Sequence, residues 1–277
     1  MHANLPIPFW KMNGAGNDFI VIDHRKPLIP VERMAEFARL VCRRKFSVGA
    51  DGLFLLEPSQ RADFRWRFFN ADGSEAEMCG NGARCVARFA YMNGLAAARM
   101  RFETLAGIID ASVADTQVTI RMTAPHSLQL DIEIEAAGQR WTVHSVNTGV
   151  PHLVVFTGDL DAVDVAGLGR ALRRHPRFAP AGTNVNFVDL GAGSLAIRTY
   201  ERGVEAETMA CGTGATAAAV VAVAKGLAAS PVHLTTRGGV PLSVQFSGDG
   251  PAAGHVLLRG PAHLVYRGEL TAEALIE

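Results

Sequence analysis

Apolar residues recur at helical spacing in two stretches of the chain, residues 31–44 and 161–174. Each of these stretches ends in two arginines, which suit the negative end of a helix dipole. Two further runs, residues 83–94 and 215–226, consist mainly of helix-forming residues, and each ends at a glycine. The pattern therefore predicts four helices.

Short runs of alternating or β-branched residues, bounded by Gly, Pro, Asn or Asp, predict strands. The nine clearest runs are residues 64–70, 108–113, 117–122, 141–146, 152–156, 184–190, 194–200, 241–246 and 255–260. No low-complexity tract or flexible linker interrupts them. Because strands dominate and alternate with a few helices, the sequence predicts an α/β or α+β fold.

One segment of the chain occurs twice. The sequence that begins at Cys79 returns 132 residues later at Cys211, and 12 of the 29 positions from Cys79 to Gly107 are identical without gaps. The same offset also aligns aromatic residues upstream of both cysteines. We therefore expect two similar halves, with the chain crossing from one to the other near residues 123–130.

The composition is that of an ordinary globular protein, with 48% hydrophobic and 19% charged residues among 277. Lys and Arg number 27, as do Asp and Glu, and no basic stretch with interleaved aromatics suggests a nucleic-acid partner. No secretory signal pattern and no run of 18 apolar residues is present, so we expect a soluble cytoplasmic protein without a membrane partner. The four cysteines are too few for a disulfide framework and lack the spacing of a zinc site.

Two of the cysteines stand directly before predicted helices. Cys79 and Cys211 each begin a Cys-Gly-x-Gly turn that leads into a helical run. The unpaired N–H groups and the dipole at a helix N-terminus stabilise a thiolate and lower the pKa of the thiol. The same N–H groups can bind a carboxylate. This placement predicts two reactive thiols.

A purely structural interpretation is also available, since unpaired cysteines are usually small buried hydrophobic residues. We accept it for Cys42 and Cys85, which lie inside helical patterns. For Cys79 and Cys211 it would have to explain why the same turn was kept twice. A disulfide between these two residues is disfavoured in a reducing compartment.

Two thiols related by a duplication suit the inversion of a carbon centre. If the halves face each other, one cysteine approaches each side of a small-molecule substrate. A thiolate then removes the α-proton from one face, and a thiol returns a proton to the other. Helix N-termini would stabilise the negative charge on the substrate carboxylate. Such a mechanism needs neither a cofactor nor a metal.

Four segments of the chain resemble the signature segments of diaminopimelate epimerases, which interconvert LL- and meso-diaminopimelate without pyridoxal phosphate. They are KMNGAGNDFIVID, FNADGSEAEMCGNGARC, GTNVNF and YERGVEAETMACGTGA, beginning at residues 11, 69, 182 and 200. Because the segments lie in both halves, the resemblance covers essentially the whole chain.

The resemblance implies two pseudo-symmetric domains, each a mixed sheet wrapped around a central helix, with the active site in the cleft between them. We place these domains at residues 1–127 and 128–262, with a tail, 263–277, that packs back on the first. The resemblance also implies a role in lysine and peptidoglycan precursor synthesis. A homodimer is a further expectation from the family.

The same resemblance assigns site residues. Cys79 and Cys211 match the catalytic cysteines, and His152 and Glu201 match residues that tune their pKa values. The positions that match substrate-binding residues are Asn17, Asn70, Gly80, Asn81, Asn184, Glu201, Arg202, Gly212 and Thr213. Arginine and asparagine suit a diamino diacid, because they bind carboxylates and, for asparagine, ammonium groups.

The chain departs from the family pattern at two polar positions. Many members carry Gln where Gly52 stands, and Asn where Val150 stands. Contacts between those side chains and the substrate are therefore lost or replaced here.

Two other functions compete with this assignment. One is a racemase or isomerase of the same fold with a different small substrate, because fold does not determine substrate. The other is a redox or binding protein that uses Cys79 and Cys211 as a reversible disulfide. Incorporation of deuterium from water at a substrate Cα would separate proton transfer from redox chemistry.

Overall fold

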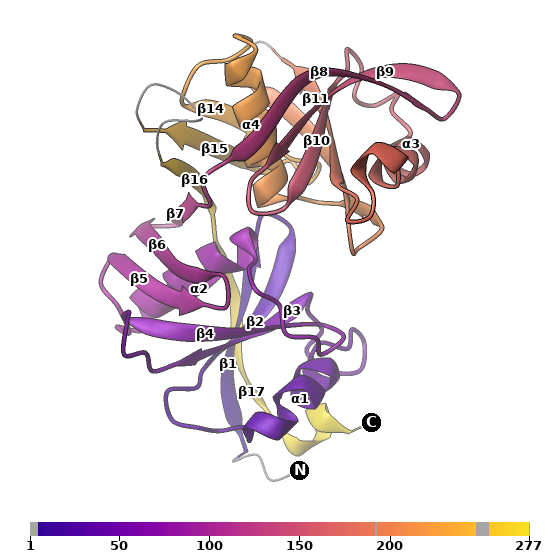
Figure 1. Cartoon of the computed structure of the whole chain (residues 1–277). Coiled ribbons are helices and arrows are strands. Elements are labelled where there is room, and N and C mark those ends of the chain that lie inside the picture. The colour runs from indigo at the N-terminus through magenta and orange to yellow at the C-terminus, as the bar shows by residue number, and fades with distance from the viewer. Residues whose placement is uncertain (1–4, 192, 248–254, 277) are drawn as a thin grey trace. The chain divides into compact units, whose positions relative to one another are not determined.

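The computed structural model describes residues 5–191, 193–247 and 255–276. It divides into two compact units, which are labelled element by element in Figure 1. The first unit comprises Met1–Ile120 and Pro261–Glu277, and the second comprises Arg121–Gly260.

The first unit is one mixed sheet with two α-helices. Its helical segments are η1 (Val31–Arg33), α1 (Met34–Val41), α2 (Gly80–Met92) and η3 (Ala272–Leu275). Its strands are β1 (Ile7–Gly14), β2 (Asn17–Asp23), β3 (Gly52–Glu57), β4 (Phe64–Asn70), β5 (Arg99–Thr104), β6 (Gly107–Ala114), β7 (Gln117–Met122) and β17 (His263–Leu270). They pair in the order β17-β1-β2-β3-β4-β5-β6-β7, and only β2–β3 and β4–β5 are parallel.

The second unit has the same construction. Its helical segments are α3 (Val165–Arg173), η2 (Pro176–Phe178) and α4 (Gly212–Ala224). Its strands are β8 (His126–Ala136), β9 (Gln139–Asn147), β10 (Pro151–Phe156), β11 (Asn184–Leu190), β12 (Leu195–Glu201), β13 (Ala206–Thr208), β14 (Val232–Thr235), β15 (Pro241–Phe246) and β16 (Val256–Pro261). They pair in the order β8-β9-β10-β11-β12-β14-β15-β16, where β10–β11 and β12–β14 are parallel and β13 pairs with β12.

The duplication predicted from the cysteine segments is confirmed in the topology. Helices α2 and α4 are 132 residues apart at both ends, and the parallel pairs fall at the same places in the two strand orders. Strand β17 follows the second repeat in sequence and pairs with β1 of the first unit. Strand β8 follows the first repeat and pairs with β9 of the second unit. Each sheet is therefore completed by a strand from after the other repeat.

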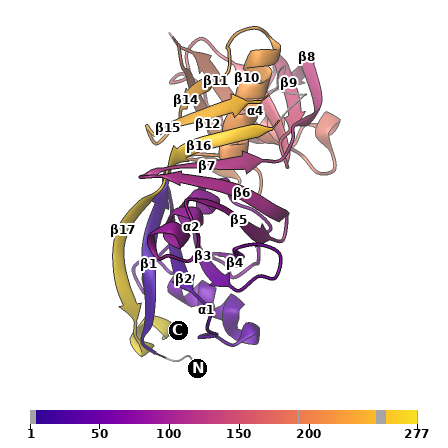
Figure 2. The same cartoon turned by 90° about the vertical axis from the view of Figure 1, so that its left-hand side faces the viewer.

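In each unit the sheet curves around one central helix. Figure 2 shows α2 enclosed by the strands of the first unit, and α2 contacts β1, β2 and β6. Helix α4 contacts β9, β10, β11, β12 and β15 in the same way. The expected fold class, two duplicated α/β domains with a strand-rich sheet around a central helix, is confirmed.

The remaining helices, α1 and α3, cover the other face of each sheet. In the second unit, Leu168 and Leu172 of α3 form one hydrophobic cluster with Val185 and Phe187 of β11. Because side chains alternate along a strand, Asn184 and Asn186 of β11 belong to the opposite face, toward α4. The side of β11 toward α3 is thus apolar, and its side toward α4 carries two asparagines.

All four predicted helices and all nine predicted strands are present, with ends shifted by a few residues. The strands missed by the sequence pattern are β1, β2, β3, β5, β8, β13, β14 and β17. Strand β3 shows one reason, because all six of its residues are buried and its sequence GLFLLE does not alternate. Among the described residues, no helix is long and apolar enough to span a membrane.

Candidate functional site

Cys79 and Cys211 are the N-cap residues of α2 and α4. Their backbones have nearly the same extended conformation, with φ and ψ of −145° and 113° for Cys79 and −126° and 111° for Cys211. Each Sγ accepts a hydrogen bond of 3.4 Å from the backbone N–H three residues later, of Gly82 and Gly214 respectively. Both thiols are half-buried. The N–H groups and the helix dipole favour the thiolate form of such a cysteine.

The first helical residues after each cysteine are Gly80 and Asn81 in α2, and Gly212 and Thr213 in α4. N–H groups in the first turn of a helix have no carbonyl partner within the helix. Such N–H groups can bind an anion, and here they lie beside each thiol. In α4 the Thr213 Oγ1 also lies 3.4 Å from Cys211 Sγ.

The second glycine of each Cys-Gly-x-Gly turn is required by close packing. A Cβ on Gly82 would lie 2.2 Å from Cζ of Phe54, and a Cβ on Gly214 would lie 2.3 Å from Oδ1 of Asn186. Both helices therefore press directly on the middle of a strand, β3 or β11.

In the first unit, two predicted site residues contact each other. The side-chain amide of Asn81 donates to Oδ1 of Asn17 at 2.6 Å. Asn17 in turn donates from Nδ2 to Asp51 Oδ2 at 3.0 Å. Because a carboxylate only accepts hydrogen bonds, this contact determines the orientation of the Asn17 amide. Sequence reasoning did not single out Asp51.

A cluster of charges holds Asp51 in place. Arg44 donates to Asp51 Oδ1 at 2.9 Å and also pairs with Asp18, and Lys11 lies 2.7 Å from Asp18 Oδ2. Burial alone would raise the pKa of Asp18, but hydrogen bonds from Arg44 and Lys11 and their charges more than offset this effect and lower it. Asn17 is therefore held in place by Asp51, which belongs to a network of ion pairs.

Arg84, on the second turn of α2, is fully buried. It donates to Oδ1 of Asn81 at 2.7 Å and to the carbonyl oxygens of Gly80 and Pro261 at 3.3 Å each. Burial lowers the pKa of Arg84, whereas the Cys85 and Cys79 thiolates would raise it. A buried cation within electrostatic range of Cys79 favours a negative charge on that thiol.

Asn70 stands at the end of β4 and forms the turn that follows. Its Nδ2 donates to Ser74 Oγ at 3.0 Å, and its backbone N–H donates to the Ser74 carbonyl at 2.8 Å. Asn70 is therefore held by the turn that follows β4.

In the second unit, Asn184 and Arg202 are brought together by β11 and β12. The backbone N–H of Arg202 donates to Oδ1 of Asn184 at 2.8 Å, and Asn184 Nδ2 donates to the carbonyl of Pro151 at 3.0 Å. The Arg202 guanidinium donates to the Ala181 carbonyl at 3.2 Å. Asn184 thus positions the backbone of Arg202, and the side chain of Arg202 ends near the loop before β11.

Glu201 and His152 both have shifted pKa values. Burial raises the pKa of Glu201, and a hydrogen bond of 3.0 Å from Thr208 Oγ1 acts in the opposite direction. Burial lowers the pKa of His152 to about 3, and the positive charge of Arg202 adds to this effect. His152 is therefore a neutral imidazole at ordinary pH.

The diaminopimelate epimerase family model matches residues 9–128 and 144–265, so it includes both cysteine turns. The chain is 46% identical to the diaminopimelate epimerase of Aquifex aeolicus, over 96% of its length and 99% of that protein. It is 47% identical to the diaminopimelate epimerase of Hydrogenobaculum sp., over 95% and 98%. The chain belongs to the diaminopimelate epimerase family. It is an isomerase.

Solved structures share the fold at much lower identity. A probable proline racemase from Agrobacterium radiobacter K84 matches with a TM-score of 0.71 and 19% identity, over 96% of this chain and 93% of that one. Membership of the family therefore rests on sequence, and this likeness supports the architecture alone.

The two departures from the family pattern have different structural settings. A Cβ on Gly52 would lie 2.7 Å from both Phe68 Cε2 and the Phe69 carbonyl oxygen, so no larger side chain fits there without movement. Phe68 fills that space. The carbonyl of Val150 accepts from the Thr148 N–H at 3.1 Å, and its side chain is half-buried.

The two cysteines assigned structural roles are buried. Burial raises the pKa of both Cys42 and Cys85 to about 12, so these thiols stay protonated at neutral pH. Within the part of the chain that the structure describes, no three His, Cys, Asp or Glu side chains form a group that would hold a metal.

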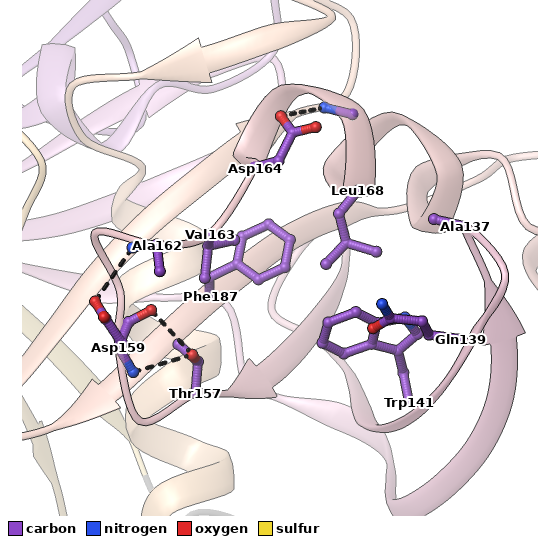
Figure 3. A pocket seen from close by; sticks show the side chains of 11 residues that line it. Ala137, Gln139, Trp141, Thr157, Asp159, Ala162, Val163, Asp164, Leu168 and Phe187 are labelled. Atoms are coloured by element: carbon purple, nitrogen blue, oxygen red, sulfur yellow. Dashed lines mark hydrogen bonds between the residues drawn. The ribbon is translucent and has the colours of Figure 1, made fainter.

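A pocket of about 590 Å³ opens elsewhere in the second unit, between the β8–β9 hairpin and α3 (Figure 3). Trp141, Leu168 and Phe187 give it an apolar wall. Its carboxylates are engaged locally, since Asp164 accepts from the Gly167 N–H at 2.9 Å and Asp159 accepts from neighbouring backbone N–H groups at 3.1 Å. None of the predicted site residues lines this pocket.

Four residues whose side chains hydrogen-bond to predicted site residues were not identified from the sequence. They are Asp51, Arg84, Thr148, whose Oγ1 donates to the Thr213 carbonyl at 3.0 Å, and Asn186. The repeat contained a signal for two of them. The 132-residue offset aligns Arg84 with Thr216 and Asn186 with Phe54. At each of these positions the side chains of the two repeats differ in charge or polarity.

Proposed function

We propose that this chain interconverts LL- and meso-diaminopimelate by proton transfer at one Cα, with Cys79 and Cys211 as the two proton-transfer groups. The observation that carries the proposal is the equivalence of the two thiols. Both cap a helix with the same backbone conformation and accept the same N–H contact at 3.4 Å. Two equivalent groups suit a reaction whose forward and reverse directions differ only in handedness.

In the proposed mechanism both cysteines act on one substrate molecule. One cysteine, as a thiolate, removes the α-proton, and the other, as a thiol, donates a proton to the opposite face. The negative charge that develops on the substrate carboxylate is stabilised by the first-turn N–H groups of α2 and α4. Gly80 and Asn81 supply these groups from one helix, and Gly212 and Thr213 supply them from the other.

The distal end of the substrate is held by polar side chains of both units. Arg202 binds the distal carboxylate, and Glu201, with Asn17, Asn70 and Asn184, completes the recognition of a diamino diacid. His152 and Glu201 influence the thiol pKa values. These roles are supported by the match of each residue to the family motifs and by the fixed amide orientations of Asn17 and Asn184.

The wider setting belongs to the same proposal. The reaction serves lysine and peptidoglycan precursor synthesis in the cytoplasm, and the enzyme is a homodimer. Exposed apolar side chains on β17, Val265 and Tyr266, are available for a contact between two copies. Sedimentation of the purified protein tests the dimer independently of activity.

The decisive experiment is incubation of the purified protein with LL-diaminopimelate in deuterated water. We expect conversion to the meso isomer, with one deuterium incorporated at the inverted Cα. Turnover should survive exhaustive chelation, because the mechanism uses no metal. Conversion of other amino acids with no reaction of diaminopimelate would instead favour a racemase of different specificity. Absence of any exchange at Cα, with reversible oxidation of Cys79 and Cys211, would favour the redox function.

A further inference from the structure

Asn186 of β11 is completely buried and lies beneath the first turn of α4. Its amide has three polar neighbours. Nδ2 donates to the carbonyl oxygen of Leu153 at 2.8 Å and lies 3.1 Å from Nδ1 of His152, and Oδ1 accepts from Thr199 Oγ1 at 2.9 Å. All these residues belong to the second unit.

These contacts determine which ring nitrogen of His152 carries the proton. The Leu153 carbonyl can only accept, so the amide nitrogen of Asn186 must face it. The second hydrogen of that nitrogen then points to His152 Nδ1. Because the amide nitrogen cannot accept a hydrogen bond, Nδ1 must present a lone pair. In the neutral imidazole the proton is therefore on Nε2.

The other side of the ring has an unused donor. His152 is 1% exposed, and its Nε2 has no hydrogen-bond partner in the described part of the chain. A buried N–H without an acceptor destabilises the fold, and such groups are uncommon unless a ligand completes them. His152 pairs with Asn184 across β10 and β11, and Asn184 binds the backbone of Arg202. The unused donor thus lies among the predicted site residues.

The duplicated half shows that Asn186 does more than fill space. The equivalent position in the first unit is Phe54. A Cβ added to Gly82 of α2 would lie 2.2 Å from Phe54, and a Cβ added to Gly214 of α4 would lie 2.3 Å from Asn186. A ring at this position supports a cysteine helix as well as an amide does. The amide in the second unit therefore needs a separate reason, and its contact with His152 supplies one.

We propose that Asn186 is a positioning residue that holds His152 as the Nε2–H tautomer, so that His152 donates a hydrogen bond to an anionic group at the site. The acceptor is either the substrate carboxylate or the Cys211 thiolate. The tautomer is independent of the reaction, and only the acceptor rests on the proposed function. In this role His152 influences the anion as a neutral donor and does not itself take up the proton.

The tautomer can be measured directly by long-range ¹H–¹⁵N correlation on protein labelled with ¹⁵N-histidine. The His152 signals are assigned by their absence from the His152→Gln spectrum. We expect an unprotonated Nδ1 and a protonated Nε2 in the parent protein. A protonated Nδ1 would overturn the proposal, and this result does not depend on enzyme activity.

Two variants test the cause. In Asn186→Asp a carboxylate replaces both N–H donors, so Nδ1 of His152 should become protonated. Thr199→Val is the matched control, because it removes the hydroxyl on the other side of the amide and should leave Nδ1 unprotonated. We expect kcat to fall about 10- to 100-fold in Asn186→Asp, the scale of one hydrogen bond to a charged group, and much less in Thr199→Val. An unchanged tautomer in Asn186→Asp would assign Asn186 a packing role only.

The anionic acceptor is identified with Cys211→Ala. A shift of the Nε2–H signal between the parent and Cys211→Ala without substrate identifies the thiolate. A shift that appears only when diaminopimelate is added to Cys211→Ala identifies the carboxylate. If neither comparison moves the signal, His152 has no anionic acceptor and that part of the proposal is wrong. The measured tautomer of His152 does not depend on which acceptor is found.

Discussion

Helices α2 and α4 begin in the same way and rest on different side chains. Under α2 lies an aromatic cluster, in which the Phe54 ring stacks on Phe68 at 4.4 Å and lies 4.9 Å from Trp66. Under α4 lies the polar group of His152 and Asn186 with Thr199. The helix bodies differ as well, since α2 buries a charged residue, Arg84, and α4 is apolar almost throughout.

The difference separates what the two halves share from what each does alone. The shared part is the N-cap cysteine, the first-turn N–H groups and a glycine pressed against a strand. These features follow from the backbone, so they can be kept while the side chains around them change. Under the proposed function, a substrate with one reacting centre and one distant end needs a thiol for each of its two faces and different contacts elsewhere. The shared features would supply the thiols, and the differences between the halves would supply the other contacts.

The largest effect is expected when one of the two equivalent thiols is removed. In Cys79→Ala or Cys211→Ala one face of the substrate loses its proton-transfer group, so inversion should fall by several orders of magnitude. The remaining thiolate can still exchange the α-proton on its own face with solvent. The two variants should therefore incorporate deuterium from opposite stereoisomers, as measured by mass spectrometry. Cys42→Ala is the control and should still invert. Exchange from the same stereoisomer in both variants would contradict one cysteine per face.

A smaller effect is expected where the halves differ in charge. The repeat offset pairs Arg202 with Asn70, so the cation belongs to the second unit alone. Loss of one charged contact costs about 1.5 to 3 kcal/mol, so Arg202→Met should reduce kcat/KM for diaminopimelate roughly ten- to a hundredfold. Steady-state kinetics measures this. The exposed Arg174→Met should leave it unchanged, and equal values for both variants would remove Arg202 from the site.

Stability measurements sharpen the comparison of the two packing contacts. Gly82→Ala pushes a methyl group into the Phe54 ring, and Gly214→Ala pushes one into the Asn186 amide. Each should lower the free energy of unfolding by about 1 to 3 kcal/mol, the usual cost of overpacking a core. Urea denaturation gives the values. Gly158→Ala is the control, since nothing lies within 4 Å of a Cβ there. A loss of stability no greater than that of the control would show that β3 and β11 move to accommodate the added methyl group at little cost.

Near neutral pH the smallest effect is the pH dependence that the buried imidazole adds to the second unit. The pKa of His152 is lowered from its ordinary value of 6.5 to about 3 by burial. Between these values the unfolded chain binds a proton that the folded chain does not. The stability that the neutral ring contributes is therefore complete above pH 6.5 and is lost as the pH falls toward 3, at no more than about 1.4 kcal/mol per pH unit.

Chemical denaturation of the parent and His152→Gln at several pH values checks this slope. Below pH 6.5 the free energy of unfolding should fall more steeply in the parent than in the variant. Other groups titrate nearby: burial lowers the pKa of His144 in the same direction, and burial raises that of Glu201 with the opposite effect on stability. Both occur in parent and variant, so they cancel in the difference. Parallel curves would mean that His152 is protonated in the folded protein.

The sequence by itself determined the duplication, the four helices and the position of both thiols. Cys79 and Cys211 could be placed at helix N-termini because capping is local: the cysteine, the two glycines and the helical run that follows lie within a few residues of one another. The register of the repeat then predicted two domains of one fold. Strand β3 could not be predicted from the sequence pattern, since burial on both faces removes the alternation that identifies a strand.

Only the tertiary structure decided what surrounds the thiols. Asn186 and His152 are 34 positions apart, as are Asn17 and Asp51, and Arg84 binds a carbonyl 177 positions away. Sheet pairing and chain return create these contacts, so no local pattern encodes them. Hydrogen-bond geometry then assigns each amide its orientation and His152 its tautomer, because a donor and an acceptor must meet in the folded chain. Residue type alone permits either orientation of an amide and either tautomer of a histidine.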